Sequence, residues 1–141
     1  MTVELLDEGP DDVETVLIAW LAPLRNTVNA RRSGDPLPQT VVVHLDSNES
    51  VQESWSDALV SIHTLCDKAL GYVAARDEAD KTHRRMLLLA RYLEDVELAD
   101  GRKASIQYVN VQTPHWEEYG DDQILQKVGR CTVGLSYARI S

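Results

Sequence analysis

The sequence lacks the features of a membrane or secreted protein. No run approaches the roughly 20 consecutive apolar residues needed to cross a bilayer, and the N-terminal MTVELLDEG does not have the pattern of a signal peptide. Only two cysteines occur, Cys66 and Cys131, each inside an apolar run. We therefore expect no membrane association, and we expect buried thiols in a reducing compartment rather than a disulfide.

Positive charge is also scarce. Fourteen Lys and Arg residues stand against 23 Asp and Glu residues, which gives a formal net charge of −9. A protein that binds nucleic acid by neutralising phosphates needs the opposite balance. An acidic surface suits a protein that stays soluble, or one past which DNA moves without binding.

Catalytic motifs are missing as well. There is no Gly-rich phosphate loop, no GxSxG, and no strong motif that places a nucleophile beside a histidine. His44, His63, Cys66 and Cys131 have the chemistry of zinc ligands, but no CxxC or HxxxH spacing holds them together. His83 lies on a charged helical flank, where we expect it to be solvated. We expect no catalytic residue, no metal site, no cofactor and no enzyme activity.

The clearest element that is present is a long amphipathic helix over Lys68–Leu93. Its predicted buried face recurs at steps of three and four residues: Ala75, Ala79, Thr82, Met86, Ala90 and Leu93. Leu87 and Leu88 are expected to widen that face in the second half. The rest of the chain reads as a sheet that this helix covers.

A shorter helix is expected to begin at Asp11, its predicted N-cap, and to end near Pro23. Alternation and β-branched runs predict strands at Thr40–Leu45, Leu59–Cys66, Asp95–Ala99, Arg102–Val111 and Gln123–Arg139. Asp100-Gly101 predicts the tight turn of a hairpin between the third and fourth of these strands. Arg25–Pro38, Asp46–Asp57 and Thr113–Asp122 are expected to be loops. The fold class predicted is α+β: a single domain over 1–141, with a mostly antiparallel sheet of four to five strands and both helices packed on one face.

Bulky rings and arginines fall in the expected loops. The rings are Trp55, His115, Trp116 and Tyr119, and the arginines are Arg25, Arg31 and Arg32. Large aromatic side chains and arginine anchor protein–protein interfaces. The alternative is that Trp116 and Tyr119 fold back over the edge of the core.

Several segments of the sequence, taken together, resemble those of a known protein family. A strand VSIHTLC leads to a helix with THRRMLLL, followed by VELADGRKASI, WEEYGDDQI and VGRCTVGLSYAR; VLIAWLAPL and LPQTVVV precede them. In this arrangement the chain resembles the tail terminator proteins of long-tailed (siphovirus) phages that infect actinobacteria. The resemblance implies a virion structural protein at the head–tail junction, assembled in the host cytoplasm. It would form a hexameric ring on the last ring of the tail tube protein, stop polymerisation and meet the head–tail connector, while DNA passes through the pore. The family has no active site or cofactor to carry over.

From this resemblance we expect Arg25, Arg31 and Arg32 to pair with acidic positions of an adjacent subunit or of the tube. The acidic segment Asp46–Asp57 is the candidate tube-facing or lumen-facing element. A neck or connector subunit is the alternative within structural proteins. A small-molecule-binding domain with a pocket under the long helix near Tyr72 and Tyr92, and a metal-dependent enzyme, are the alternatives outside it.

Overall fold

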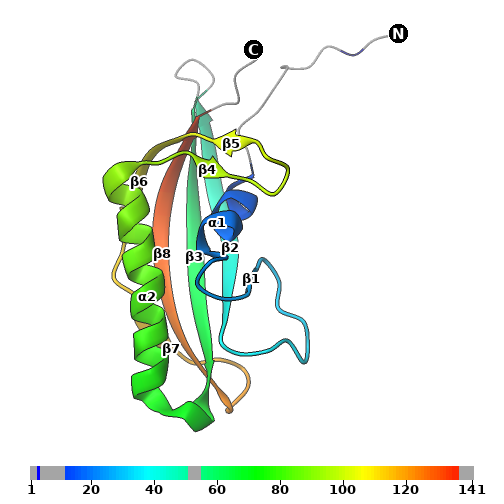
Figure 1. The fold of residues 1–141 in the computed structure, drawn as a ribbon, viewed down its shortest axis with the longest axis vertical. Coiled ribbons are helices and arrows are strands. Elements are labelled where there is room, and N and C mark those ends of the chain that lie inside the picture. Colours follow the sequence, from blue (N-terminus) through cyan, green and yellow to red (C-terminus); the bar gives the residue numbers. More distant parts are fainter. Residues whose placement is uncertain (1–2, 4–11, 51–54, 137–141) are drawn as a thin grey trace.

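The computed structural model describes residues 3, 12–50 and 55–136, and it has two helices on one face of a twisted sheet (Figure 1). The helices are α1 (Val13–Leu21) and α2 (Gly71–Tyr92), and a single 3₁₀ turn, η1 (Lys68–Leu70), precedes α2. The strands are β1 (Thr27–Val28), β2 (Gln39–Ser50), β3 (Trp55–Asp67), β4 (Val96–Glu97), β5 (Lys103–Ala104), β6 (Ile106–Val111), β7 (His115–Glu117) and β8 (Ile124–Ser136). The predicted α+β class, with both helices on one face, is confirmed.

The main sheet has the strand order β1-β2-β3-β8-β6, and β7 pairs with β8 on the same side as β6. Among the described strand pairs, only β1–β2 is parallel. Two short strands, β4 and β5, form a separate hairpin at the predicted turn Asp100-Gly101. The rest of the strand predicted at Arg102–Val111 is β6, which pairs with β8 instead. The sheet has six strands rather than four to five, because β1 and β7 lie inside segments that were expected to be loops.

The prediction of a loop at Asp46–Asp57 is wrong for the described residues of that segment. Strands β2 and β3 stay paired through Asn48 with Asp57 and Ser50 with Trp55, so this segment is an extension of one long hairpin. Its polar composition suggested a loop, but inter-strand backbone hydrogen bonds do not require apolar side chains. Trp55 consequently begins a strand, and residues 51–54 lie outside the described part of the chain.

Helix α1 begins with a side-chain cap one residue later than expected. The Asp12 carboxylate accepts hydrogen bonds from Thr15 N at 3.3 Å and from Thr15 Oγ1 at 2.9 Å. Asp11, the predicted cap, lies outside the described residues. The helix ends at Leu21, before Pro23, and buries the residues at core-facing steps: Val13, Val16, Leu17, Trp20 and Leu21.

Helix α2 presents a narrow, small-residue face to the sheet. Its buried residues are Ala75, Ala79, Thr82, Met86 and Leu89. Leu87 and Leu88 do not widen that face, because they are 44% and 39% exposed. Each residue advances about 100° around the helix axis, so once Met86 points inward the next inward position is Leu89.

The two helices are held together by a reciprocal contact. Trp20 Nε1 donates to the Arg85 carbonyl oxygen at 3.0 Å, and Arg85 Nε donates to the Trp20 carbonyl oxygen at 2.9 Å. The guanidinium carbon of Arg85 also lies 3.7 Å from the centroid of the Trp20 ring, a cation–π contact. The angle between α1 and α2 is therefore set by specific polar contacts as well as by burial.

Both faces of the sheet carry apolar clusters. The main core lies under the helices and includes Leu17, Leu21, Val42, Val60, Met86, Leu89, Val133 and Leu135. Because side chains alternate along a strand, Leu65 lies on the opposite face of β3 from Thr64 and Cys66. A second cluster forms on that opposite face, from Val28, Leu37, Val41, Val43, Leu65, Tyr119 and Ile124.

On the same outer face, Tyr108 of β6 covers Gly134 of β8. The two residues pair across the strands, and the Tyr108 hydroxyl donates a hydrogen bond to Asp57 Oδ1 on β3. Burial, together with this hydrogen bond to Asp57, raises the pKa of Tyr108 to about 12. The glycine is thus explained by an aromatic ring that occupies the space of its missing side chain.

We predict that Gly134→Ala destabilises the fold by about 1–3 kcal/mol, because overpacking a filled site displaces its neighbours. A Cβ at this position would lie 2.4 Å from Tyr108 Cε1. Gly120→Ala is the matched control, since a Cβ there meets nothing within 4 Å. Urea denaturation measures both, and adding Tyr108→Ala should reduce the cost of Gly134→Ala. Equal effects at the two glycines would contradict the packing role of Tyr108.

Candidate functional site

The most connected charged residue, Arg25, faces the interior. Its side chain is only 4% exposed. Arg25 Nη2 and Nε donate to Glu78 Oε2 at 2.8 and 3.1 Å, and Nη2 also donates to the Glu78 carbonyl oxygen at 2.9 Å. The guanidinium thus ties the segment that follows α1 to helix α2.

The remaining donors of Arg25 reach the threonines of the sheet and helix. Its Nη1 donates to Thr40 Oγ1 of β2 at 2.9 Å and to Thr82 Oγ1 of α2. Thr64 Oγ1 of β3 in turn donates to Thr82 Oγ1 at 3.1 Å. All five N–H groups of the guanidinium are used within the subunit, so Arg25 has no donor left for a neighbouring subunit.

Glu78 is the partner of Arg25 and is only partly exposed. Burial by itself would raise the pKa of Glu78, but the hydrogen bonds and charge of Arg25, with Lys81, outweigh it and hold the pKa below the ordinary value. The carboxylate therefore stays ionised while the network is intact.

Arg31 and Arg32 lie in the loop between β1 and β2, and they have different roles there. Arg31 Nη1 donates to Gln39 Oε1 at 2.7 Å, while Gln39 Nε2 donates to Asp35 Oδ2 at 3.0 Å. The Arg32 amide donates to the same Asp35 oxygen at 2.9 Å. These hydrogen bonds lower the pKa of Asp35, and the bond from Gln39 has the largest effect. Arg31 helps to shape the loop, and the exposed Arg32 side chain is displayed by it.

The structure brings three of the predicted ring residues together at the opposite edge of the sheet. Trp116 of β7 is 41% exposed and makes an edge-on contact with Tyr72 of α2, with centroids 5.3 Å apart. Lys127 Nζ lies 5.0 Å from the Trp116 centroid. His115 is exposed, with Nε2 3.5 Å from Glu117 Oε1. Tyr119 is half-buried against the outer apolar cluster, as the alternative of folding back over the core expected.

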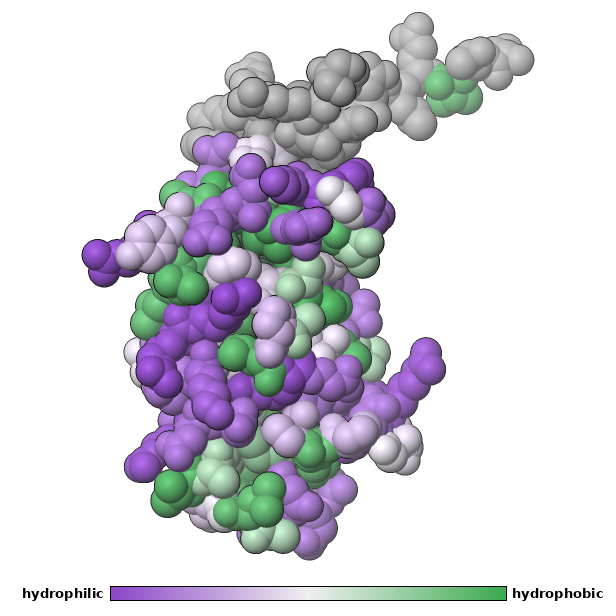
Figure 2. Space-filling model, viewed as in Figure 1, coloured by the Kyte–Doolittle hydropathy of each residue, from purple (hydrophilic) through white to green (hydrophobic). Residues whose placement is uncertain are grey.

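The rings of Tyr72, Trp116 and Tyr119 border a groove of about 560 Å³, which we call the Trp116 groove. It is lined by Lys68, Tyr72, Trp116, Glu117, Glu118, Tyr119, Asp121, Asp122, Gln123, Ile124, Leu125 and Gln126. Apolar side chains are exposed beside it where α2 begins: Leu70, Tyr72 and Val73. Figure 2 shows apolar surface at this lower end of the molecule, next to strongly polar surface.

Trp55 lies elsewhere. It begins β3 and pairs with Ser50 and Ser136, at the far end of the sheet from the Trp116 groove. Sequence reasoning missed Tyr72, which lines the groove, and Lys127, which lies next to the Trp116 ring. Tyr72 and Val73 lie outside the periodic buried face of α2, and Leu70 of the preceding turn does so too. This departure from the buried periodicity is the feature of the sequence that could have predicted their exposure.

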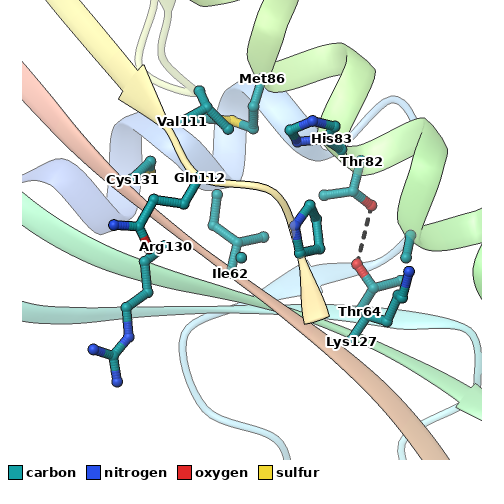
Figure 3. Close-up of a pocket in the computed structure, with 13 residues that line it drawn as sticks. Ile62, Thr64, Thr82, His83, Met86, Val111, Gln112, Lys127, Arg130 and Cys131 are labelled. Carbon is teal, nitrogen blue, oxygen red and sulfur yellow. Dashed lines mark hydrogen bonds between the residues drawn. The ribbon is translucent and has the colours of Figure 1, made fainter. Parts of the chain in front are cut away.

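The space between α2 and β8 is small, although a more open groove of about 340 Å³ adjoins it and is lined by residues that include His83, Pro114 and Lys127. The cavity between the helix and β8 measures about 20 Å³, and Figure 3 shows Met86, Ile62 and Cys131 around it. It accommodates about one water molecule, far below the volume of a ligand pocket. The Nδ1 atom of His83 at its rim has no hydrogen-bond partner among the described residues. Tyr72 and Tyr92 are both exposed, so they do not enclose a pocket under the helix.

The four residues with zinc-ligand chemistry are not assembled. His63 contacts Ser61 at 2.9 Å and Gln126 at 3.0 Å on the outer face, whereas Cys66 lies on the helix side of the same strand. Burial is the main cause that raises the pKa of Cys66 to about 11 and of Cys131 to about 12, which disfavours thiolates. Within the described part of the chain no three His, Cys, Asp or Glu residues are grouped to hold a metal, and neither helix is long and apolar enough to cross a membrane.

Comparison with known proteins finds a structural likeness only. No family model matches the chain, and no curated protein matches it. Among solved structures, the fold is similar to a chain of the "virion of native gene transfer agent (GTA) particle", with a TM-score of 0.51 and 14% sequence identity. The similarity covers 88% of this chain and 87% of that one, so it extends over nearly the whole of both folds.

We predict that Arg25→Met destabilises the protein by about 2–3 kcal/mol, because it leaves the partly buried Glu78 without its charge-assisted hydrogen bonds. Arg76→Met on the exposed face of α2 is the matched control and should change stability by less than about 0.5 kcal/mol. Chemical denaturation measures both. Similar losses in the two variants would show that Arg25 acts through its general charge and not through this network.

The lowered pKa of Glu78 predicts a pH dependence of stability. A carboxyl whose pKa is lower in the folded state stabilises the fold above its ordinary pKa of 4.5, and the contribution is lost as the pH falls through the folded-state pKa. The stability difference between the wild type and Glu78→Gln should therefore be full at pH 7 and shrink below about pH 4.5. Asp77→Asn, an exposed neighbour on the same helix, is the control. A difference that does not vary with pH would contradict the assignment.

Proposed function

We propose that this chain is a virion structural protein of a phage-like particle. The observation that carries the proposal is the likeness of the whole fold to a chain of a gene transfer agent virion, which covers almost the full length of both chains. The resemblance of the sequence to tail terminators points to the same kind of particle. The proposed location is the virion, at the junction of head and tail.

The finer proposal is that six copies form a ring that caps the tail tube, ends its polymerisation and meets the head–tail connector. An open sheet with two different edges supports this role, because a heterologous contact between unlike surfaces closes into a ring when its rotation allows. At one edge, β1 pairs with only Thr40 and Val41, so among the described residues the rest of β2 has no partner strand on the side away from β3. At the other edge are β6 and β7.

The charge of the chain supports passage of DNA without specific binding. The net charge is −9, and acidic residues lie on the exposed part of the long hairpin, including Asp46 and Glu49. Carboxylates along a pore repel the phosphates of DNA and let it slide. This hairpin extension, now a paired β-structure rather than a loop, remains our candidate for the element that meets the tube or the lumen.

The proposal includes no catalytic activity, and the chemistry of the described residues supports that. The two thiols are buried with raised pKa values, and the histidines are dispersed over the fold. A neck or connector subunit is the second candidate, because such a protein also presents unlike surfaces to two partners. Binding to purified tube ends rather than to portal separates the two roles.

We predict that the purified protein forms a closed ring with a mass near six times 15.8 kDa, measured by native mass and imaged by electron microscopy over a range of concentrations, with and without magnesium. Added to polymerising tail tube protein, it should bind tube ends and shorten the tubes. Tubes of unchanged length, with none of this protein at their ends, would contradict the proposed capping role.

A further inference from the structure

No segment of the described subunit occupies the Trp116 groove, and the side chains that line it favour a particular kind of ligand group. The groove combines exposed aromatic rings, Trp116 and Tyr72, with four carboxylates against one ammonium group in its lining, that of Lys68, while Lys127 lies beside it with Nζ 5.0 Å from the Trp116 centroid. The carboxylates belong to Glu117, Glu118, Asp121 and Asp122. An aromatic face beside several carboxylates favours a guanidinium, which stacks on the ring and donates to the acids at the same time.

Such a guanidinium is displayed on the other edge of the same molecule. Arg32 is exposed, and its side chain makes no hydrogen bond or ion pair with the described residues. Its loop is held in shape from within by Asp35 and Gln39. A displayed side chain on a preorganised loop loses little entropy when it binds.

The loop and the groove are placed at the same level of the sheet. The loop leads into Gln39, which pairs with Leu65, and Leu65 pairs with Gln126 of the groove. Both features therefore lie at the end of the sheet where β2 and β8 begin, the lower end in Figure 1, but β1 and β7 are on opposite edges. A contact between opposite edges is heterologous, and it closes into a ring rather than an open filament when its rotation allows.

We propose that the Arg32 loop of one copy of this chain docks into the Trp116 groove of the next copy. The loop comprises residues 29–37, and Arg32 is the side chain that enters between Trp116 and the carboxylates. Arg31 stays in its own subunit as the support of the loop. This inference rests on the proposed ring, since it names the contact that joins one subunit to its neighbour.

The test is self-association measured by analytical ultracentrifugation. Arg32→Glu should weaken the dissociation constant at least tenfold, because it places a carboxylate against carboxylates. Arg91→Glu makes the same charge change on an exposed arginine at the far end of α2, and it should stay within about twofold of the wild type. Adding Glu118→Arg and Asp122→Arg to Arg32→Glu should restore association. Salt at 0.5 M should weaken the wild-type contact, since these charges are solvent-accessible.

Chemical cross-linking tests the contact between the Arg32 loop and the Trp116 groove even when association is weak. Ser33→Cys and Asp122→Cys proteins, mixed with a short bismaleimide, should give a heterodimer, while each protein alone should give far less. The native thiols do not interfere, because Cys66 and Cys131 are both buried. A wild type that stays monomeric and a mixture that gives no heterodimer would overturn the inference.

The remaining outcomes separate this inference from the proposed function. If rings form equally well with Arg32→Glu, the docking contact is wrong and the ring stands. If Trp116→Ala abolishes tube capping but leaves the rings intact, the groove holds the tube subunit and not a second copy. If the docking contact is confirmed but the rings leave tube length unchanged, the tail-capping function fails and the subunit contact stands.

Discussion

The buried guanidinium of Arg25 is the constraint on which the arrangement of layers depends. It is nearly inaccessible, and its five N–H groups reach an acid and a threonine on α2 and a threonine on β2, with Thr64 of β3 completing the network. A buried cation is costly unless it is paired and fully hydrogen-bonded, so helix and strands must meet in one register to satisfy it. Together with the reciprocal hydrogen bonds between Trp20 and Arg85, it fixes both helices over one face of the sheet.

With the helices confined to one face, the surfaces left for partners differ in chemistry. The β1 edge carries a preorganised basic loop with Arg32 at its surface, and the β7 edge carries an aromatic groove with four carboxylates. A contact between these two unlike edges would be heterologous, and such a contact closes into a ring when its rotation allows.

Much of the fold was predictable from the sequence, because periodic burial leaves a direct trace in it. The long helix, the Asp100-Gly101 hairpin and the last strand follow from spacing alone. The error at Asp46–Asp57 has a physical cause, since an exposed hairpin is held by backbone hydrogen bonds that any side chains permit. At the candidate site, His115, Trp116 and Tyr119 were identified as a group, whereas Tyr72 and Lys127 join them only through the pairing of β7 with β8 and the packing of α2.

The sequence by itself determined which segments bury a face, that the surface is acidic, and that bulky rings and arginines fall outside the regular core pattern. Tertiary structure alone decided the roles of the three arginines, which look equivalent in a polar segment. Arg25 turns inward to Glu78, Arg31 bonds Gln39 in its own loop, and Arg32 is left exposed. The reason is that the role of a charged side chain depends on which partners come within hydrogen-bond distance, and the fold brings Glu78 to Arg25 from 53 residues away in sequence.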